Sequence, residues 1–424
     1  MPIKKLFTLF ICTLTLAVSF TSCGDEAFDV DSVNKQTILV FFPWTGSTNT
    51  PGLYADLLNN VDSICAGIEA KKGLNNTRVL LFMSQNYQKS HLIDLKYDES
   101  TKKVVKDTLK TYEGTDYATA EGFASILNEV KQDAEALNYA LIIGAHGCGW
   151  TYASDWVNYP NYARPKADSS SAPNQKGNNF SGIDFEGDAN HPGTRFFGSV
   201  SLADEAIDVP TLAEGIKMSG IKMQYILFDA CYMGNVETAY ELKDVTNYMI
   251  ASSSEIMQYG LPYKSIWTYL NSTTPNYSSI VSTSINFYKT TDTPYLNLGV
   301  TDCRQLDALA SVMKNINSNH TLASDISLES IQKLDGFEPT MFYDLGVYVD
   351  SLCPSGMLKD QFNTQLKKTI KASGSTDQAY TMLFSLRGTT FDIKSYSGLT
   401  ISDPSLHSVA IKGREKTGWW KATH

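Results

Sequence analysis

The sequence contains few cysteines and lacks the signature motifs of several common enzyme classes. Seven cysteines in 424 residues are far too few for a disulfide scaffold, which excludes the small disulfide-rich folds. There is no Walker loop, no G-x-G-x-x-G fingerprint and no H-E-x-x-H motif. The phosphate, dinucleotide and zinc-peptidase sites that these motifs build are therefore not expected.

Positive charge is also in deficit. The chain has 35 basic and 45 acidic residues, a formal net charge of -10, which argues against nucleic acid as a partner. Only 19% of the residues are charged, whereas 42% are hydrophobic and Tyr and Phe number 23 and 19. That composition excludes a disordered chain. The length allows two or three domains, or one large α/β domain with an appendage.

The N-terminus has the features of a targeting segment. Two lysines precede Leu6–Phe20, an apolar stretch that is shorter than the ~20 residues of a membrane-spanning helix. The residues before Cys23 resemble the lipobox of bacterial lipoproteins, which implies a signal peptide at 1–22, a lipidated Cys23 and a tether at 23–35. We expect the lipid to hold the protein at the outer membrane or cell surface. An ordinary secretory signal is the alternative.

Short apolar runs alternate with amphipathic segments along the chain. Such runs, apolar throughout, predict an α/β fold with a mostly parallel sheet flanked by helices on both faces. The expected strands are 36–44, 77–85, 139–146, 223–231, 247–255 and 295–302, with a hairpin at 91–106 and late strands at 380–388 and 396–404. The expected helices are 54–68, 118–136, 209–218, 235–242, 263–270, 278–288, 303–315, 345–352 and 358–372.

One long segment, 151–195, breaks this alternation. It is rich in Asn, Asp, Ser, Gly, Pro and Tyr and has almost no aliphatic periodicity. A loop longer than ~15 residues is uncommon in a compact domain and is usually functional or disordered. We expect a main domain at 36–262 that contains this loop, and a smaller C-terminal region of helices and strands at 263–424.

Two of the expected strands end in residues that can carry chemistry. "YALIIGAHGCGW" delivers His146, and "YILFDACYMGN" delivers Cys231. Ligands of open parallel sheets bind outside the carboxyl ends of the strands, so neighbouring strands would bring imidazole and thiol together. A nearby imidazole can lower the pKa of a thiol or take its proton during attack. The N–H groups of Gly147 and Cys231 are candidates for an oxyanion hole.

Other readings of these residues remain open. A lone cysteine or histidine at a strand end is often structural, and His146, Cys148 and Cys231 or His191 could bind zinc. A disulfide oxidoreductase would need a second thiol such as Cys148, but there is no C-x-x-C pair. Five cysteines follow Cys23, which are Cys65, Cys148, Cys231, Cys303 and Cys353. Because this number is odd, at least one of their thiols stays unpaired.

The motifs "GAHGCGW" (144–150) and "DACYMG" (229–234) resemble the clostripain-type cysteine peptidases, part of the caspase-like group. "TILVFFPW", "IASSSEIMQYGLPY", "MFYDLGVYV" and "TGWW" are weaker matches elsewhere in the chain. The resemblance implies a caspase-like fold and a cysteine endopeptidase in which His146 and Cys231 form the catalytic dyad. The alternative is an inactive lipoprotein that captures peptide or glycan on the same scaffold.

The resemblance also implies substrate preference and processing. Asp229, two residues before the nucleophile, matches the acid that favours Arg or Lys before the cleaved bond, and Glu255 is the candidate for a second acid. Asp229 could instead cap the turn. Related enzymes are cut between the His and Cys strands, where the candidate positions are Arg164, Lys166, Lys176 and Arg195.

Few partners other than a substrate are implied. Calcium assists some relatives, and "DWVNYPN" and "GIDFEGDAN" supply oxygens, although neither follows an EF-hand pattern. No cofactor is expected to be required. We expect a monomer that acts on peptide or protein substrates and contacts the membrane through Cys23.

Overall fold

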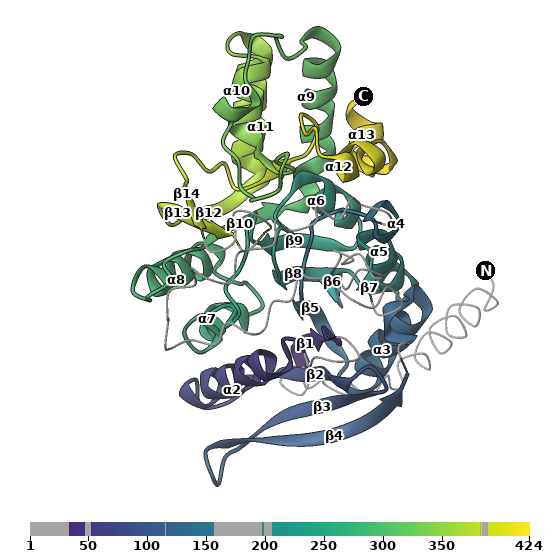
Figure 1. Cartoon of the computed structure of the whole chain (residues 1–424). Helices are drawn as coiled ribbons and strands as arrows, with labels where there is room; N and C mark the ends of the chain where they lie inside the picture. Colours follow the sequence, from purple (N-terminus) through teal and green to yellow (C-terminus); the bar gives the residue numbers. More distant parts are fainter. Residues whose placement is uncertain are drawn as a thin grey trace, which may run out of the picture. The chain divides into compact units, whose positions relative to one another are not determined.

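A nine-stranded sheet organises residues 34–424, which form one compact unit. The computed structural model describes residues 34–46, 52–114, 116–156, 197–198, 206–381, 383 and 389–424 (Figure 1). The strand order is β12-β10-β9-β8-β5-β1-β2-β3-β4. The strands are β1 Asn34–Phe42, β2 Thr77–Asn86, β3 Lys89–Asp98, β4 Lys103–Glu113, β5 Ala136–Gly144, β8 Met223–Asp229, β9 Thr246–Ala251, β10 Asn297–Asp302 and β12 Ile370–Ser375.

The five central strands are parallel, and antiparallel strands extend the sheet on both sides. β2, β1, β5, β8 and β9 pair in parallel, whereas β3 and β4 on one side and β10 and β12 on the other are antiparallel. The parallel strands are buried on both faces, which explains their continuously apolar sequences. The predicted α/β architecture with a mostly parallel centre is thus confirmed.

Side chains of β1 alternate between two cores, one on each face of the sheet. Leu39 and Phe41 pack in one core, with helices α3 (Ala120–Asp133), α5 (Val209–Met218) and α6 (Val236–Leu242). Ile38 and Val40 pack in the other core. That second core takes side chains from α2 (Tyr54–Ala70), α7 (Tyr263–Leu270) and α8 (Tyr277–Lys289). The two groups of helices lie on opposite sides of the sheet in Figure 1.

The C-terminal part of the chain adds both to the sheet and to its cover. Helices α9 (Leu306–Asn319), α10 (Leu345–Leu352), α11 (Met357–Thr369) and α13 (Gly418–Thr423) contribute to the core of α3 and α5. β11 (Tyr343–Asp344) pairs with β15 (Thr400–Ile401), and β13 (Gln378–Thr381) with β14 (Thr389–Asp392). Within the described residues, the remaining elements are α4 Ala153–Trp156, β6 Phe197–Gly198, β7 Ala206–Ile207, α12 Ser408–Gly413 and four short 3-10 turns.

One helix boundary predicted from the sequence is wrong. The helix expected at 358–372 ends at Thr369, and Ile370–Ser375 forms β12, antiparallel to β10 at the edge of the sheet. The hairpin expected at 91–106 is longer and joins the opposite edge as β3 and β4. The two late strands shrink to β13 and β15 in the described part of the chain.

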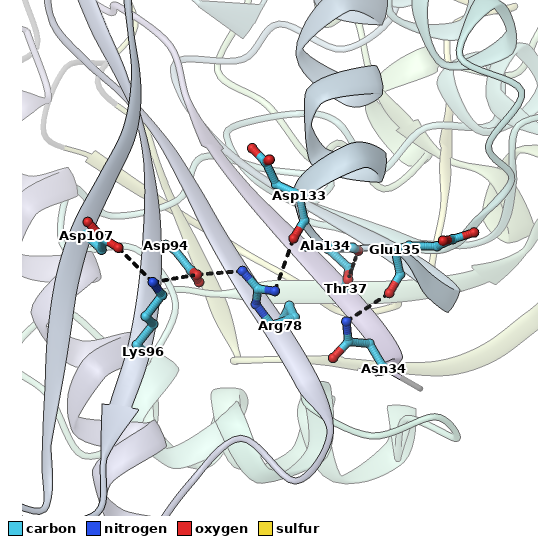
Figure 2. Close-up of polar contacts among 9 residues, drawn as sticks. All are labelled: Asn34, Thr37, Arg78, Asp94, Lys96, Asp107, Asp133, Ala134 and Glu135. Atoms are coloured by element: carbon cyan, nitrogen blue, oxygen red, sulfur yellow. Dashed lines mark hydrogen bonds and ion pairs between the residues drawn. The ribbon is translucent and has the colours of Figure 1, made fainter. Parts of the chain in front are cut away.

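A polar network joins β2, β3, β4 and α3 near the amino ends of the central strands (Figure 2). Arg78 on β2 pairs with the buried Asp94 of β3 at 2.5 Å and donates to the carbonyl of Asp133 at the end of α3. Lys96 lies 3.7 Å from the same carboxylate and 2.7 Å from Asp107 on β4. Four elements are therefore joined through one buried carboxylate. No helix in the described residues is long and apolar enough to cross a membrane.

Candidate active site

The carboxyl ends of β5 and β8 bring His146 and Cys231 to the same edge of the sheet. Gly144 at the end of β5 is the register partner of Asp229 at the end of β8, and the Ala145 N–H donates to the Asp229 carbonyl at 3.3 Å. His146 and Cys231 each lie two residues beyond this pair. Both line one cleft with about 440 Å³ of empty space, part of it open to solvent.

The walls of this cleft come from four separate parts of the chain. The two strand ends contribute Ala145, His146, Asp229, Ala230 and Cys231. The start of α2 contributes Leu53, Leu57 and Asn60, and the loop after β9 contributes Ile256, Met257, Gln258 and Gly260. The pairing of β5 with β8 brings the two strand ends together, although they are 85 residues apart in the sequence (231 − 146).

Cys231 lies on a sharp turn that other elements hold in place. The next residue, Tyr232, has φ +60°, a left-handed conformation that costs free energy for a residue other than glycine. Its N–H donates to the Ser254 carbonyl at 3.1 Å, and its ring stacks on Phe342 at 5.6 Å. The buried Tyr232 hydroxyl donates to Glu255 at 2.6 Å. These contacts offset the backbone strain and fix the position of the thiol.

The sulfur of Cys231 contacts the backbone of Ile256. The Ile256 N–H donates to the sulfur at 3.3 Å, and the thiol points to the Ile256 carbonyl at 3.8 Å. Within the described residues, no hydrogen bond joins this sulfur to the His146 ring. The two side chains therefore share one cleft without a direct hydrogen bond in this state.

Burial sets the protonation of both groups. It lowers the pKa of His146 to about 4, so the imidazole is neutral at pH 7. Burial, and after it the charge of Glu255, raises the pKa of the Cys231 thiol, although the Ile256 N–H opposes this shift. An imidazole can assist a thiol either as a preformed ion pair or by taking its proton during attack, and these protonation states favour proton transfer during attack.

Gly147 packs directly on the peptide of Cys231. A Cβ at Gly147 would lie 2.3 Å from the Cys231 carbonyl oxygen and 3.0 Å from its nitrogen, so only glycine allows this approach. Neither the Gly147 N–H nor the Cys231 N–H donates a hydrogen bond within the described chain. Both N–H groups are therefore available as donors in the described part of the chain, one on Cys231 itself and one on the glycine that packs against its peptide.

Asp229 is a buried carboxylate in the same cleft. The Leu261 N–H at 3.2 Å and the Tyr263 hydroxyl at 2.8 Å both donate to Oδ2. Oδ1 is buried and has no hydrogen-bond partner in the described part of the protein. Burial raises the pKa of Asp229 to about 6, and the two donors limit this rise. Asp229 thus accepts a backbone N–H, as the turn-capping reading expects, and keeps one oxygen free.

The structure separates Glu255 from the residues that line the cleft. Its carboxylate accepts the Tyr232 hydroxyl, behind the nucleophile turn. Its hydrogen bond with Tyr232 supports the turn, its charge acts on the nearby Cys231 thiol, and its role as a second acid for a basic side chain stays a prediction. The other predicted site residues, which are Cys23, Arg164, Lys166, Lys176 and Arg195, lie outside the described residues.

The described residues offer no set of ligands for a metal ion. No group of three or more His, Cys, Asp or Glu side chains is arranged to hold a metal ion there. His191, the fourth ligand considered for zinc, lies outside this part, as do residues 157–161 and 182–190 of the two acidic segments considered for calcium.

Sequence reasoning missed three residues of the pocket around Asp229. Asn60 and Gly260 line the cleft, and Tyr263 binds Asp229. Asn60 has no local motif, since it lies within an ordinary amphipathic helix. The Gly-Leu-Pro-Tyr stretch at 260–263 could have drawn attention, because a glycine before a proline marks a turn next to the expected strand end.

Comparisons with known proteins agree with this geometry. The clostripain family model (Peptidase_C11) matches residues 182–401. The X-ray structure of iotapain, a secreted C11 cysteine protease from Bacteroides thetaiotaomicron, aligns with 37% identity and a TM-score of 0.78 over 92% of this chain and 99% of that chain. No curated protein matches the chain.

Two further structures extend the likeness. A clostripain from Bacteroides thetaiotaomicron ATCC 29148 in complex with the peptide inhibitor BTN-VLTK-AOMK aligns with 46% identity and a TM-score of 0.51, over 54% of this chain and 99% of that chain. An inactive zymogen C11 protease from Parabacteroides distasonis shares the fold at 21% identity, with a TM-score of 0.72 over 92% of this chain and 98% of that chain. The family model covers more than half of this sequence, and the alignment with iotapain covers most of this chain and nearly all of iotapain. The chain therefore belongs to the clostripain family and is a cysteine-type peptidase.

Proposed function

We propose that the protein is an endopeptidase in which Cys231 attacks the peptide carbonyl, His146 moves the proton, and Asp229 selects Arg or Lys before the cleaved bond. The observation that carries this proposal is the common cleft. It is lined by the thiol, the imidazole and the buried carboxylate from two adjacent strand ends. The same three residue types at these positions carry the resemblance to the clostripain peptidases.

The chemistry follows from the protonation states. The neutral imidazole of His146 takes the thiol proton as the sulfur bonds to the carbonyl carbon, and the oxygen gains the charge. The free N–H groups of Gly147 and Cys231 receive that charge. The imidazolium then donates its proton to the leaving amine as the C–N bond breaks, which leaves a thioester. His146 next deprotonates a water that hydrolyses the thioester and restores the thiol.

Preference for a basic residue rests on the free oxygen of Asp229. A buried carboxylate with an empty acceptor site is costly until a cation pairs with it, so a peptide with Arg or Lys gains what a neutral side chain lacks. The inhibitor bound to the related Bacteroides clostripain has a peptide part that ends in lysine. Asp229 therefore defines the binding site for the residue before the cut.

Fluorogenic peptides ending in Arg, Lys, Leu or Asp test the proposal. We expect cleavage of the Arg and Lys peptides only, loss of cleavage in Cys231→Ala and after thiol alkylation, and a large loss in His146→Ala. Asp229→Asn should abolish the preference for basic residues while a slow turnover of Leu peptides remains. If Cys231→Ala keeps activity, or the wild type cleaves none of these peptides, the inactive binding scaffold becomes the better reading.

We also propose that the enzyme cuts itself after one of Arg164, Lys166, Lys176 or Arg195. Intact mass spectrometry of wild type and Cys231→Ala tests this proposal. Processing in the wild type alone supports self-cleavage, whereas equal processing in both points to another protease. Adding EGTA to the same assay tests calcium, for which we expect a change of less than twofold in activity.

Lipid anchoring through Cys23 is part of the same proposal. The sequence before Cys23 supports it, and the iotapain structure is that of a secreted protease. Labelling cells with an alkyne fatty acid should mark the wild type and leave Cys23→Ala unlabelled. A labelled Cys23→Ala protein, or an unlabelled wild type, would support an ordinary secretory signal. Gel filtration of the soluble domain should give a monomer.

A further inference from the structure

The two oxygens of Asp229 are not equivalent. Oδ2 accepts both the Tyr263 hydroxyl at 2.8 Å and the Leu261 N–H at 3.2 Å. Oδ1 has no partner among the described residues. The protein itself therefore occupies one side of the carboxylate, and a ligand that enters the cleft meets a single free oxygen.

Packing around Tyr263 keeps Oδ2 occupied. Tyr263 is fully buried in the core of α2, α7 and α8, so its hydroxyl has little freedom to turn away. Gly260, at φ +66°, lies so close that a Cβ there would be 2.5 Å from Oδ2. The hydroxyl of Tyr288 donates to the Gly260 carbonyl at 2.7 Å and holds this segment in place. The acceptor positions of Oδ2 are thus taken by the Leu261 N–H and by the fixed Tyr263 hydroxyl.

A second acceptor lies next to this pocket. Asn60 is buried, lines the cleft and uses its Nδ2 to donate to the Tyr259 carbonyl at 2.8 Å. This bond fixes the amide so that Oδ1 of Asn60 remains as an acceptor, and a Cβ at Gly260 would lie 3.0 Å from it. A side chain bound in this pocket therefore meets one oxygen of Asp229 and one oxygen of Asn60, and does not meet both oxygens of a single carboxylate.

Lysine and arginine make different demands on such a pocket. A guanidinium is a planar fork that pairs best with both oxygens of one carboxylate. An ammonium is a compact charge with three rotatable donors, which can be shared between oxygens of different groups. We propose that Tyr263, by occupying Oδ2 of Asp229, makes the enzyme prefer lysine over arginine before the cleaved bond. This inference rests on the proposed function, since Asp229 must be the residue that binds the basic side chain.

Tyr263 acts through Asp229 and is a positioning residue. Replacing it with Phe keeps the ring in the core and removes only the hydroxyl, which frees one acceptor site on Oδ2. A guanidinium can then reach both oxygens, whereas an ammonium gains little. The ratio of kcat/KM for matched Lys and Arg peptides isolates this effect, because losses of folding or of catalytic chemistry divide out of the ratio.

The experiment compares wild type, Tyr263→Phe and Tyr225→Phe on two peptides that differ only in Lys or Arg before the cut. We expect a wild-type Lys/Arg ratio of kcat/KM of about 10 or more, the factor that corresponds to the net contribution of one hydrogen bond to a charged group. In Tyr263→Phe the ratio should fall at least fivefold, through a gain on the Arg peptide. Tyr225→Phe is the matched control, since it loses an equally buried hydroxyl that donates to the Leu270 carbonyl at 3.3 Å and does not touch Asp229, and its ratio should stay within twofold of wild type.

The possible results distinguish a failure of the proposed function from a failure of the role of Tyr263. A wild type that cleaves neither peptide, or a Cys231→Ala variant that cleaves both, overturns the proposed function. A wild type that cleaves both but favours Arg, or a folded Tyr263→Phe with an unchanged ratio, overturns the role of Tyr263 and leaves the peptidase intact. Should Tyr263→Phe fail to fold, the relative binding of Lys and Arg peptide aldehydes to wild type decides, because tighter binding of the Arg aldehyde contradicts the preference.

Discussion

At the scale of single residues, burial decides how the thiol and the imidazole share one proton. The pKa of Cys231 is raised and the pKa of His146 is lowered to about 4, both mainly by burial. The resting enzyme therefore holds a neutral pair, with the proton on sulfur. In the proposed mechanism, a substrate that enters the cleft brings His146 and the sulfur into proton-transfer contact, since the hydrogen bonds of the sulfur within the described chain join it to Ile256.

The rate of alkylation of Cys231 by iodoacetamide should reveal this resting state. Because only the thiolate reacts, we expect the rate to rise about tenfold per pH unit from pH 6 to 8, without a plateau at low pH. His146→Ala should change the rate less than threefold, since a neutral ring does not stabilise the thiolate. Cys231→Ala supplies the background of the four buried cysteines. A rate independent of pH between 5 and 7 would indicate a preformed thiolate–imidazolium pair.

The central residues of the site were predictable because neighbouring parallel strands place their carboxyl ends on the same side of a sheet. His146, Asp229 and Cys231 follow apolar strands, so their meeting required only that β5 and β8 be neighbours. The contacts of Glu255 were not predictable, because one residue of shift along a loop decides whether a side chain enters the cleft. Tyr263 was equally hidden, since no local pattern tells which buried tyrosine turns its hydroxyl toward a carboxylate.

At the scale of elements, the site depends on how closely two strand ends approach. The loop after β5 lies against the turn after β8 through Gly147, and the segment after β9 runs beside the same turn, where the Gly234 N–H donates to the Ser252 carbonyl at 2.7 Å. The apolar strands and amphipathic helices that build this frame were evident from their periodicity. β12 was not, because its half-exposed residues lack a strand pattern and follow a helix without an intervening turn signal.

Gly147→Ala should disable the enzyme and also lower its stability, because the added methyl meets backbone atoms. The added methyl would meet the Cys231 carbonyl at 2.3 Å, so the two strand ends must separate and the Gly147 and Cys231 N–H groups lose their alignment. Loss of a donor to the oxyanion costs about 100-fold or more in kcat, and we expect at least that fall. Gly220→Ala is the control, since its Cβ meets nothing within 4 Å and only backbone strain is added. Retention of more than a tenth of the activity by Gly147→Ala would contradict this role.

The polar network of Arg78, Asp94 and Lys96, near the amino ends of the central strands, should affect the stability of the protein and not its catalysis. Arg78→Ala leaves the carboxylate of Asp94, which is fully buried, with only Lys96 at 3.7 Å (Figure 2). Removing one partner of a buried ion pair is strongly destabilising, and we expect a loss of about 3 kcal/mol in the free energy of unfolding. Lys102→Ala, which breaks an exposed pair with Glu99, should cost less than about 0.5 kcal/mol. Urea titrations measure both values, and equal effects would contradict the importance of burial.

At the scale of the whole molecule, the C-terminal part supports the nucleophile turn directly. The Thr400 N–H donates to the Gly234 carbonyl at 3.0 Å, and Asn235 and Thr400 form a parallel bridge. The Ser402 N–H donates to Glu237 in the first turn of α6 at 2.7 Å. Helix α6 begins just after Cys231, so residues far along the chain hold the segment that carries the thiol. The carboxylates of Glu237 and Asp403 are both buried at this junction.

Ionisation of Glu237 should weaken this junction as the pH rises. Burial, and then the charge of Asp403, raises the pKa of Glu237 to about 8, above its value of roughly 4.3 in an unfolded chain. The folded state therefore binds the proton more tightly, and the resulting stabilisation is complete below pH 4.3 and is lost as the pH rises through about 8. Glu237→Gln cannot ionise and keeps an oxygen for the Ser402 N–H, so it should escape this loss.

Thermal unfolding at a series of pH values tests this expectation, with Cys231→Ala in both proteins to prevent cleavage. At pH 5 the Gln variant and its parent should have similar Tm values, because a protonated Glu and a Gln have nearly the same shape and charge. By pH 8.5 the variant should be more stable, by roughly 2 °C or more. Asp335→Asn is a useful comparison, since burial also raises the pKa of Asp335, to about 7, in a loop that does not contact Ser402. Parallel Tm curves for Glu237→Gln and its parent would mean that Glu237 is already ionised in the folded protein, with its charge tolerated at the junction.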